Sequence, residues 1–245
     1  MDINKLAQIN LEALKNNPYP GRIIILGMDE SKKNLIQIYA IMGRSENSRN
    51  RVFVCADGNR LETKAADPAK VTDPNLIIYE AMNSIGNIYV VSNGHQTTPA
   101  LLHRSENASL KGLMNLDDWK YEPDEPNYTP RITGMIVNSL FPHAEILILK
   151  KSPFGTDCQK QLYHYTTFQP GYGYCVSTYE GDGNPLPPFE GEPYLLPLSG
   201  GHHEIAGKLW KALNPDNRVS LAVKAIDIQT GKITMEIINK YHAVD

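Results

Sequence analysis

Pairs of short apolar runs, rich in isoleucine and valine and joined by brief polar turns, are the sequence feature that most constrains the fold. Residues 22–27 and 35–42 form the first pair, and residues 51–56 and 60–65 form a second pair around an Asp-Gly dipeptide. Short β-branched runs bounded by turn residues are typical of strands, and Asp-Gly is a strong hairpin signal. The chain is therefore expected to fold largely through antiparallel hairpins.

The remaining runs extend this pattern. Further strands are expected at 76–82, 87–92, 131–137, 144–150, 218–228 and 232–239, with two more inside 159–179 that break at Gly171 and Gly173. Helices are expected at 3–15, 98–105, 108–118 and 202–213. Residues 181–200 are rich in glycine and proline and are expected to be mostly loop.

Roughly ten strands in hairpin-like pairs, with helices clustered between strand groups, predict an α+β layered architecture of mostly antiparallel sheets. The sequence contains neither a G-x-G-x-x-G nor a G-x-x-x-x-G-K-[ST] motif, so neither a dinucleotide fold nor a P-loop is supported. No interior segment has the composition of a long linker. A single domain over residues 1–245 is expected, with residues 1–20 as a helical N-terminal extension.

Composition narrows the possible partners and compartment. The formal net charge of −3 argues against a general nucleic-acid binder. The longest apolar runs fall far below the ~20 residues that a membrane-spanning helix needs, and the N-terminus lacks the pattern of a signal peptide. The three cysteines are far apart and form no metal-binding pattern. We therefore expect a cytoplasmic protein that contacts neither membrane nor nucleic acid.

The connection 42–51, MGRSENSRNR, concentrates three arginines, two serines and two asparagines between two predicted strands. Arginine offers a planar fork of donors that suits phosphate, and serine and asparagine add short hydrogen-bonding arms. Only Glu46 offsets the three cations. The residues leave two alternatives open, which are a binding site for a small anion and a solvated hairpin tip.

Four further polar clusters lie at the ends of predicted elements, and each has a structural alternative. They are Tyr79-Glu80, residues 93–98, residues 121–131 and residues 200–204. Tyr79 on an apolar strand can be a core phenol, Asn93-Gly94 can be a turn, and the carboxylates at 122–125 can be solvated.

The cluster at 200–204 combines two glycines with two histidines and a glutamate. Adjacent histidines on a helix face different directions, and the H-E-x-x-H spacing is absent, so we predict no metal site. The glycines Gly200-Gly201 could present backbone N–H groups to an anion or form a flexible turn before the helix.

Six motifs occur in order along the chain: YPGRIIILG (19–27), MGRSENSRNR (42–51), NLIIYEAM (75–82), SNGHQT (92–97), YEPDEPNYTPRI (121–132) and GGHH (200–203). Together they resemble the archaeal-type IMP cyclohydrolase family. The resemblance extends from about Gly21 through at least His203. Residues 42–51 and 121–132 are its most specific parts.

The resemblance implies a fold, a reaction and an assembly. Members of that family have the four-layered α-β-β-α sandwich of N-terminal nucleophile hydrolases, without the processed N-terminal nucleophile. They convert 5-formamidoimidazole-4-carboxamide ribonucleotide into IMP and water, with no cofactor or metal required. A cyclohydrolase acting on a small purine nucleotide, as a homo-oligomer, is therefore expected. The N-terminal helix and the loop at 181–198 depart from the compact archaeal form.

The resemblance also suggests roles for individual residues. Arg44, Ser45 and Arg49 are expected to anchor the substrate, chiefly its phosphate, with Arg51 as a further substrate-binding residue. Tyr79 is the expected proton donor or oxyanion stabiliser.

The other expected site residues come from the two later motifs. Glu122 is the expected base, with Asp124 as the second candidate. Asn93 and Gly94 are expected to contact base or ribose, and Arg131 to bind substrate or pair with the carboxylates at 122–125.

Two alternative functions stay open from the sequence. One is an amide hydrolase acting on a purine-like substrate, which would need a nucleophile and a hydrolytic water. The other is a purine nucleotide-binding protein on the same fold that has lost turnover.

Overall fold

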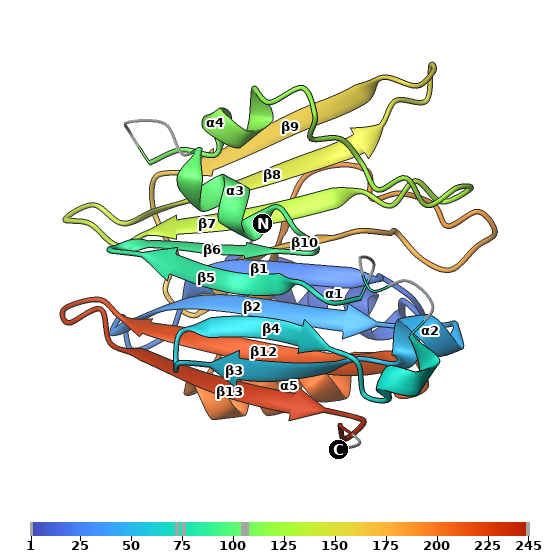
Figure 1. Cartoon of the computed structure of the whole chain (residues 1–245). Coiled ribbons are helices and arrows are strands. Elements are labelled where there is room, and N and C mark those ends of the chain that lie inside the picture. The colour runs from blue at the N-terminus through green and yellow to red at the C-terminus, as the bar shows by residue number, and fades with distance from the viewer. Residues whose placement is uncertain (1, 72–73, 75–76, 104–107, 244–245) are drawn as a thin grey trace.

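The structure is a computed structural model that describes residues 2–71, 74, 77–103 and 108–243. Two antiparallel sheets face one another in it (Figure 1). The first sheet has the strand order β11 (Tyr194–Pro197), β10 (Tyr172–Ser177), β1 (Arg22–Met28), β2 (Asn34–Met42), β12 (Arg218–Asp227) and β13 (Ile233–Asn239). The second is a meander of β3 (Val52–Ala56), β4 (Arg60–Lys64), β5 (Glu80–Ile85), β6 (Ile88–Ser92), β7 (Arg131–Val137), β8 (His143–Lys151) and β9 (Cys158–Tyr165).

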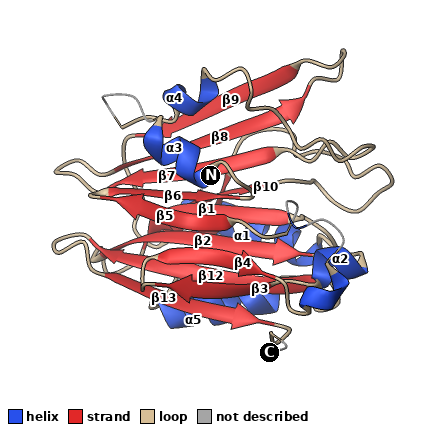
Figure 2. Cartoon of the chain, in the orientation of Figure 1, coloured by secondary structure: helices blue, strands red, loops and turns tan. Residues whose placement is uncertain are grey.

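Helices cover the outer faces of both sheets (Figure 2). Helices α1 (Ile3–Asn16) and α5 (His202–Ala212) pack on the six-stranded sheet. Helices α3 (Thr97–Leu102) and α4 (Lys111–Met114) pack on the seven-stranded sheet. The short helix α2 (Glu46–Arg49) and the 3₁₀ turn η1 (Pro68–Lys70) lie at one end of the sandwich. The chain is an α+β protein with the layer order α-β-β-α.

Three hydrophobic clusters explain why the strand sequences are apolar at nearly every position. In β1, Ile24 and Leu26 point into the core between the sheets, while Ile23 and Ile25 point toward α1 and α5. A strand buried on both faces needs no polar alternation. The nearly continuous apolar run that follows Arg22 in β1 therefore indicates a strand in an inner layer of the fold.

Most of the predicted elements are confirmed. The hairpin of β1 and β2 and the hairpin of β3 and β4 both form as predicted. Helix α5 buries Ile205 and Leu209 against the sheet and ends before Asn214, as its apolar spacing predicts.

The prediction missed two short elements and misplaced one strand. Residues 194–197 form β11 inside the expected loop, and residues 46–49 form α2 inside the arginine-rich connection. Strand β5 continues through Ile85, because a tight turn at Gly86 (φ +60°) and Asn87 leads directly into β6. Part of the strand predicted at 76–82 lies outside the described residues.

The predicted break at Gly173 was also wrong, whereas Gly171 does precede a strand. Gly173 pairs with Gly27 inside the sheet. A side chain at Gly173 would stand 2.6 Å from Ile25 and 2.9 Å from Leu198. This glycine permits close packing of the sheet and does not interrupt it.

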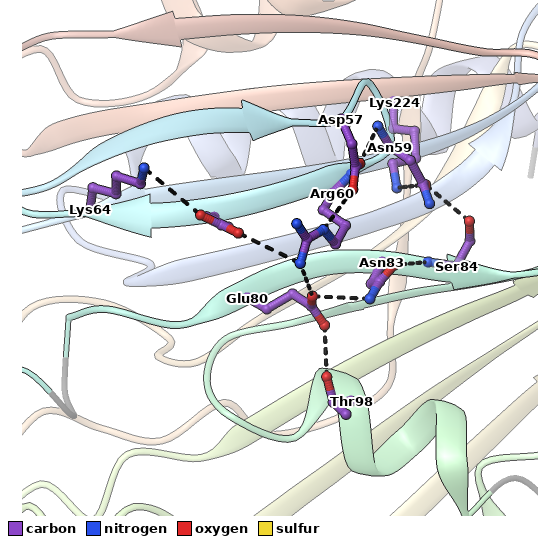
Figure 3. Close-up of polar contacts among 10 residues, drawn as sticks. Asp57, Asn59, Arg60, Lys64, Glu80, Asn83, Ser84, Thr98 and Lys224 are labelled. Carbon is purple, nitrogen blue, oxygen red and sulfur yellow. Dashed lines mark hydrogen bonds and ion pairs between the residues drawn. The ribbon is translucent and has the colours of Figure 1, made fainter.

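A polar network fixes the start of β5 (Figure 3). Arg60 of β4 lies 3.9 Å from Glu80, and Glu80 accepts hydrogen bonds from Asn83 (3.0 Å) and from Thr98 of α3 (2.8 Å). Because Glu80 follows Tyr79 directly, the network anchors the backbone next to the candidate site described below.

Candidate functional site

A cavity of about 490 Å³ opens at the end of the sandwich where α2 lies. Its lining comes from the start of β1, the connection between β2 and β3, the 122–127 loop and the segment after β10. The lining residues are Tyr19, Arg22, Arg44, Ser45, Asn47, Ser48, Arg51, Glu122, Asp124, Asn127, Tyr179 and Leu186. Five of the predicted site residues are among them: Arg44, Ser45, Arg51, Glu122 and Asp124.

Two buried arginines dominate the electrostatics of the cavity. Arg22 opens β1 with 8% of its surface exposed, and Arg51 precedes β3 with 2% exposed. Nε of Arg22 and both Nε and Nη1 of Arg51 have no hydrogen-bond partner among the described residues. Burial and the charge of Arg22 lower the pKa of Arg51, but a guanidinium starts so high that it stays charged. Buried donors without partners are costly, so an acceptor atom placed near these guanidiniums is favoured.

Glu122 is the buried carboxylate of the cavity, and its surroundings suit a general base. It is 5% exposed, and its Oε1 lies 3.9 Å from Nη1 of Arg131. Burial raises the pKa of Glu122, and this effect outweighs the opposing charges of Arg22 and Arg131. A carboxylate with a raised pKa accepts a proton more readily than a solvated one.

Tyr79 precedes β5 and is held by its backbone. Thr63 accepts from the Tyr79 N–H through Oγ1 (2.8 Å) and donates its own N–H to the Tyr79 carbonyl (2.9 Å). The Tyr79 hydroxyl lies 2.7 Å from the hydroxyl of Tyr39. Tyr79 is not a lining residue, but its phenol interacts electrostatically with both Arg22 and Arg51.

Arg44 and the serines of α2 form the outer part of the cavity. The Arg44 guanidinium lies 5.0 Å from the centre of the Tyr19 ring, donates to the Gly183 carbonyl (2.9 Å) and pairs with Asp182. Ser45 and Ser48 cap α2 reciprocally. Arg44 therefore remains partly exposed at the mouth, whereas Arg22 and Arg51 are enclosed.

Arg49 points away from this cavity. Its Nε donates to the Gly43 carbonyl (2.9 Å) and its Nη2 to Oδ1 of Asn217 (3.1 Å). It lines a separate groove with Asp67 and Lys70. Of the three arginines at 42–51, the structure brings Arg44 and Arg51 together and leaves Arg49 outside.

The 93–98 motif lies behind Glu122. The Asn93 side chain donates to the Pro130 carbonyl (2.9 Å) and accepts from the Ile132 N–H (2.9 Å), so it holds the strand that leads from Arg131. A side chain at Gly94 would stand 2.7 Å from Nη1 of Arg131. Both residues therefore shape the surroundings of the Glu122–Arg131 pair.

Arg131 and Asp124 also have partners within the protein. Arg131 donates to Oε1 of Gln96 (3.2 Å) and stacks on Trp119. Asp124 accepts from the Thr129 N–H (2.6 Å) and from the Thr129 hydroxyl, which also contacts Tyr179. Asp124 thus fixes the loop that carries Glu122.

The glycines before α5 are occupied by carboxylates of the chain. The N–H of Gly201 donates to Glu204 (3.0 Å) and that of Gly200 to Glu30 (3.2 Å). This favours the structural alternative for Gly200-Gly201. His203 pairs with Glu236 (3.1 Å), and no group of three metal-ligating side chains occurs among the described residues.

The sequence reasoning missed Arg22, which lines the cavity, and Tyr39, whose hydroxyl contacts that of Tyr79. The sequence contains one indication for Arg22. This charged residue follows Gly21 directly and precedes an uninterrupted run of apolar residues. A cation at the end of a strand buried on both faces requires a counter-charge or a ligand. Tyr39 lies in the middle of such a run and resembles any core aromatic.

Fold and cavity together define a class of protein: an α-β-β-α sandwich that holds a cationic cavity at one end of its facing sheets. A family profile described as IMP cyclohydrolase-like protein matches residues 19–232. The chain belongs to this family, and membership makes it a cyclohydrolase of the IMP cyclohydrolase type. A search of curated proteins finds no match. No helix among the described residues is long and apolar enough to cross a membrane.

Proposed function

We propose that the cavity formed around Arg22, Arg51 and Glu122 closes the ring of 5-formamidoimidazole-4-carboxamide ribonucleotide to give IMP and water. The observation that carries this proposal is the pair of buried guanidiniums with unpartnered nitrogens beside a buried carboxylate. Ring closure develops negative charge on the formyl oxygen, and preorganised donors in a water-poor site stabilise such charge strongly.

The substrate lies with its phosphate at the mouth and its reacting groups at the enclosed end. Arg44, Ser45 and Ser48 offer a guanidinium and two hydroxyls where the cavity opens. The enclosed end holds Arg51 and Glu122, which suits the uncharged carboxamide and formyl groups. In this orientation the partly exposed Arg44 binds the phosphate dianion, and the buried Arg22 and Arg51 stabilise the transition state.

Two proton carriers complete both steps of the reaction. In the first step the carboxamide nitrogen attacks the formyl carbon, Glu122 takes the nitrogen's proton, and Tyr79 gives its proton to the formyl oxygen. In the second step protonated Glu122 returns a proton to the departing hydroxyl, which leaves as water. The former formamide nitrogen gives its proton to the Tyr79 phenolate. The products are IMP and water, and both side chains return to their starting states.

The remaining predicted residues support this site from outside. We assign Asp124 and Asn93 to holding the loop and strand that flank Glu122, because their side chains bond to the backbone at Thr129, Pro130 and Ile132. Gly94 and Arg131 set the environment of the carboxylate. Arg49 supports the connection 42–51 through Gly43.

The wider predictions rest on the family and on the shared core. One hydrophobic cluster joins both sheets, which favours a single domain. The α-β-β-α layer order favours the N-terminal nucleophile hydrolase-like assignment. The cytoplasmic location and the homo-oligomer stay predictions.

Product analysis after incubation with the formamido ribonucleotide tests the proposed reaction. Formation of IMP supports it. Release of formate with recovery of the amino ribonucleotide favours the amide hydrolase, and tight IMP binding without turnover favours the binding protein.

A matched pair of variants tests the assignment of the cavity. Arg51→Met removes a buried cavity cation, whereas Arg49→Met removes the neighbouring cation that lies outside. We expect kcat to fall about a hundredfold or more in Arg51→Met, as for loss of an oxyanion donor, and to change less than about threefold in Arg49→Met. Equal losses in two folded variants would contradict the assignment.

A further inference from the structure

The two phenols behind the cavity form a pair that crosses from one sheet to the other. Tyr39 is on β2 of the six-stranded sheet, and Tyr79 precedes β5 of the seven-stranded sheet. Their hydroxyl oxygens are 2.7 Å apart. We propose that Tyr39 is a positioning residue that donates a hydrogen bond to the Tyr79 oxygen and so directs the Tyr79 proton toward the substrate. This inference rests on the proposed function for the role of Tyr79 in turnover.

Burial distinguishes the two members of the pair. Tyr39 is fully enclosed at 0% exposure, whereas Tyr79 keeps 5% of its surface exposed. Tyr39 also stacks on Phe53, with ring centroids 5.4 Å apart. Tyr39 therefore cannot meet a ligand itself and acts through Tyr79.

The direction of the hydrogen bond follows from the acceptors near Tyr39. Its hydroxyl contacts the Tyr79 oxygen, whereas the guanidiniums that face it carry donors only. The ionisable groups facing it are Tyr79, Arg22 from β1 and Arg51 from the segment before β3. Burial and the neighbouring Tyr79 raise the pKa of Tyr39, and this outweighs the opposing effect of the two arginines. Tyr39 consequently keeps its proton and can serve as the donor.

This arrangement has two consequences for Tyr79. One hydrogen lies between the two oxygens, so the hydrogen of Tyr79 itself is free to point elsewhere. When Tyr79 has given up that hydrogen, its phenolate accepts a hydrogen bond from Tyr39 beside two guanidiniums. A hydrogen bond to a charged acceptor is stronger than one to a neutral acceptor, so the bond from Tyr39 stabilises the phenolate that Tyr79 becomes and eases proton transfer.

The variant Tyr39→Phe removes the hydroxyl and keeps the ring that packs on Phe53. We expect kcat to fall about ten- to a hundredfold, with KM changed less than about twofold, because the lost bond is strongest after Tyr79 has ionised. The double variant Tyr39→Phe/Tyr79→Phe should be about as slow as Tyr79→Phe alone. Tyr89→Phe is the matched control, since Tyr89 is a buried tyrosine of the same inter-sheet core.

A readout independent of turnover separates this inference from the proposed function. In protein labelled with ¹³C at the tyrosine ζ carbon, the Tyr79 resonance is assigned by its loss in Tyr79→Phe and then titrated with base. We expect the Tyr79 phenolate signal to need more base to form in Tyr39→Phe than in wild type, and to form as in wild type in Tyr89→Phe.

Each outcome has a defined meaning. An unchanged Tyr79 titration in folded Tyr39→Phe overturns the donor role, whatever happens to kcat. A shifted titration with wild-type kcat overturns the role in proton delivery. If the wild-type protein makes no IMP, the proposed function fails, while the titration still decides whether Tyr39 donates to Tyr79.

Discussion

At the scale of single residues, the chemistry of the cavity depends on how Glu122 is balanced between burial and cations. Burial favours its neutral form, and Arg22 and Arg131 favour its charged form. The sequence placed Glu122 and Arg131 in one motif, so their proximity was predictable. The contribution of Arg22, which is a hundred residues distant in the chain, was not predictable because only the packing of the two sheets brings it near.

The variant Arg131→Met tests this balance through the pH dependence of turnover. Removing the cation at 3.9 Å should raise the pKa of Glu122 further. Because the base must be ionised, activity increases as pH rises through this pKa. We therefore expect the acid limb of the kcat/KM profile to move to higher pH.

Lys111→Met serves as the control for that profile, since Lys111 is an exposed cation of α4. Its acid limb should match the wild type. An Arg131→Met limb that stays in place or moves to lower pH would show that Glu122 is not the titrating base.

At the scale of secondary-structure elements, apolar patterns predicted inner strands well and glycine-containing segments poorly. The runs that became β1, β2 and β12 were recognisable because both of their faces are buried. Glycine can mark a turn, as at Gly86, or a close contact inside a sheet, as at Gly173. Sequence alone does not distinguish these roles, because the deciding atoms belong to distant residues.

Two glycine-to-alanine variants should change stability in opposite directions. A methyl at Gly27 would stand 2.3 Å from the Tyr172 carbonyl oxygen and 2.6 Å from Cα of Gly173, so the strands must separate. Gly207 lies within α5 with open space around it. We expect Gly27→Ala to lose at least about 1–3 kcal/mol of unfolding free energy and Gly207→Ala to gain about 0.5–1 kcal/mol. Urea denaturation measures both, and a stable Gly27→Ala would show that the β1–β10 contact can relax.

At the scale of the whole molecule, the core between the sheets carries charge as well as apolar side chains. Lys224 of β12 is fully buried and donates to Oδ1 of Asn59 (3.3 Å) across the gap between the sheets (Figure 3). It forms no ion pair among the described residues. The sequence showed a lysine inside a strand, which usually indicates a solvated face. Its burial follows only from the second sheet covering that face.

Stability should therefore depend on pH through Lys224. Burial lowers its pKa to about 8 in the folded protein, compared with about 10.4 in an unfolded chain. Between these values the unfolded chain binds more protons than the folded one, so the unfolding free energy contributed by this group increases as pH rises from about 8 to about 10. Below about pH 8 the buried charge costs its full penalty.

Lys224→Met should remove this dependence and raise stability at neutral pH by about 1–3 kcal/mol, because methionine fills a similar volume without a charge. Many tyrosines also titrate near pH 10, so the informative quantity is the difference in unfolding free energy between variant and wild type, measured in urea at pH 7 and pH 9.5. That difference should shrink at the higher pH, where the wild-type amine is neutral. A constant difference, or a variant less stable than wild type at pH 7, would mean that Lys224 is neutralised by its surroundings and that its contact with Asn59 stabilises the join between the two sheets.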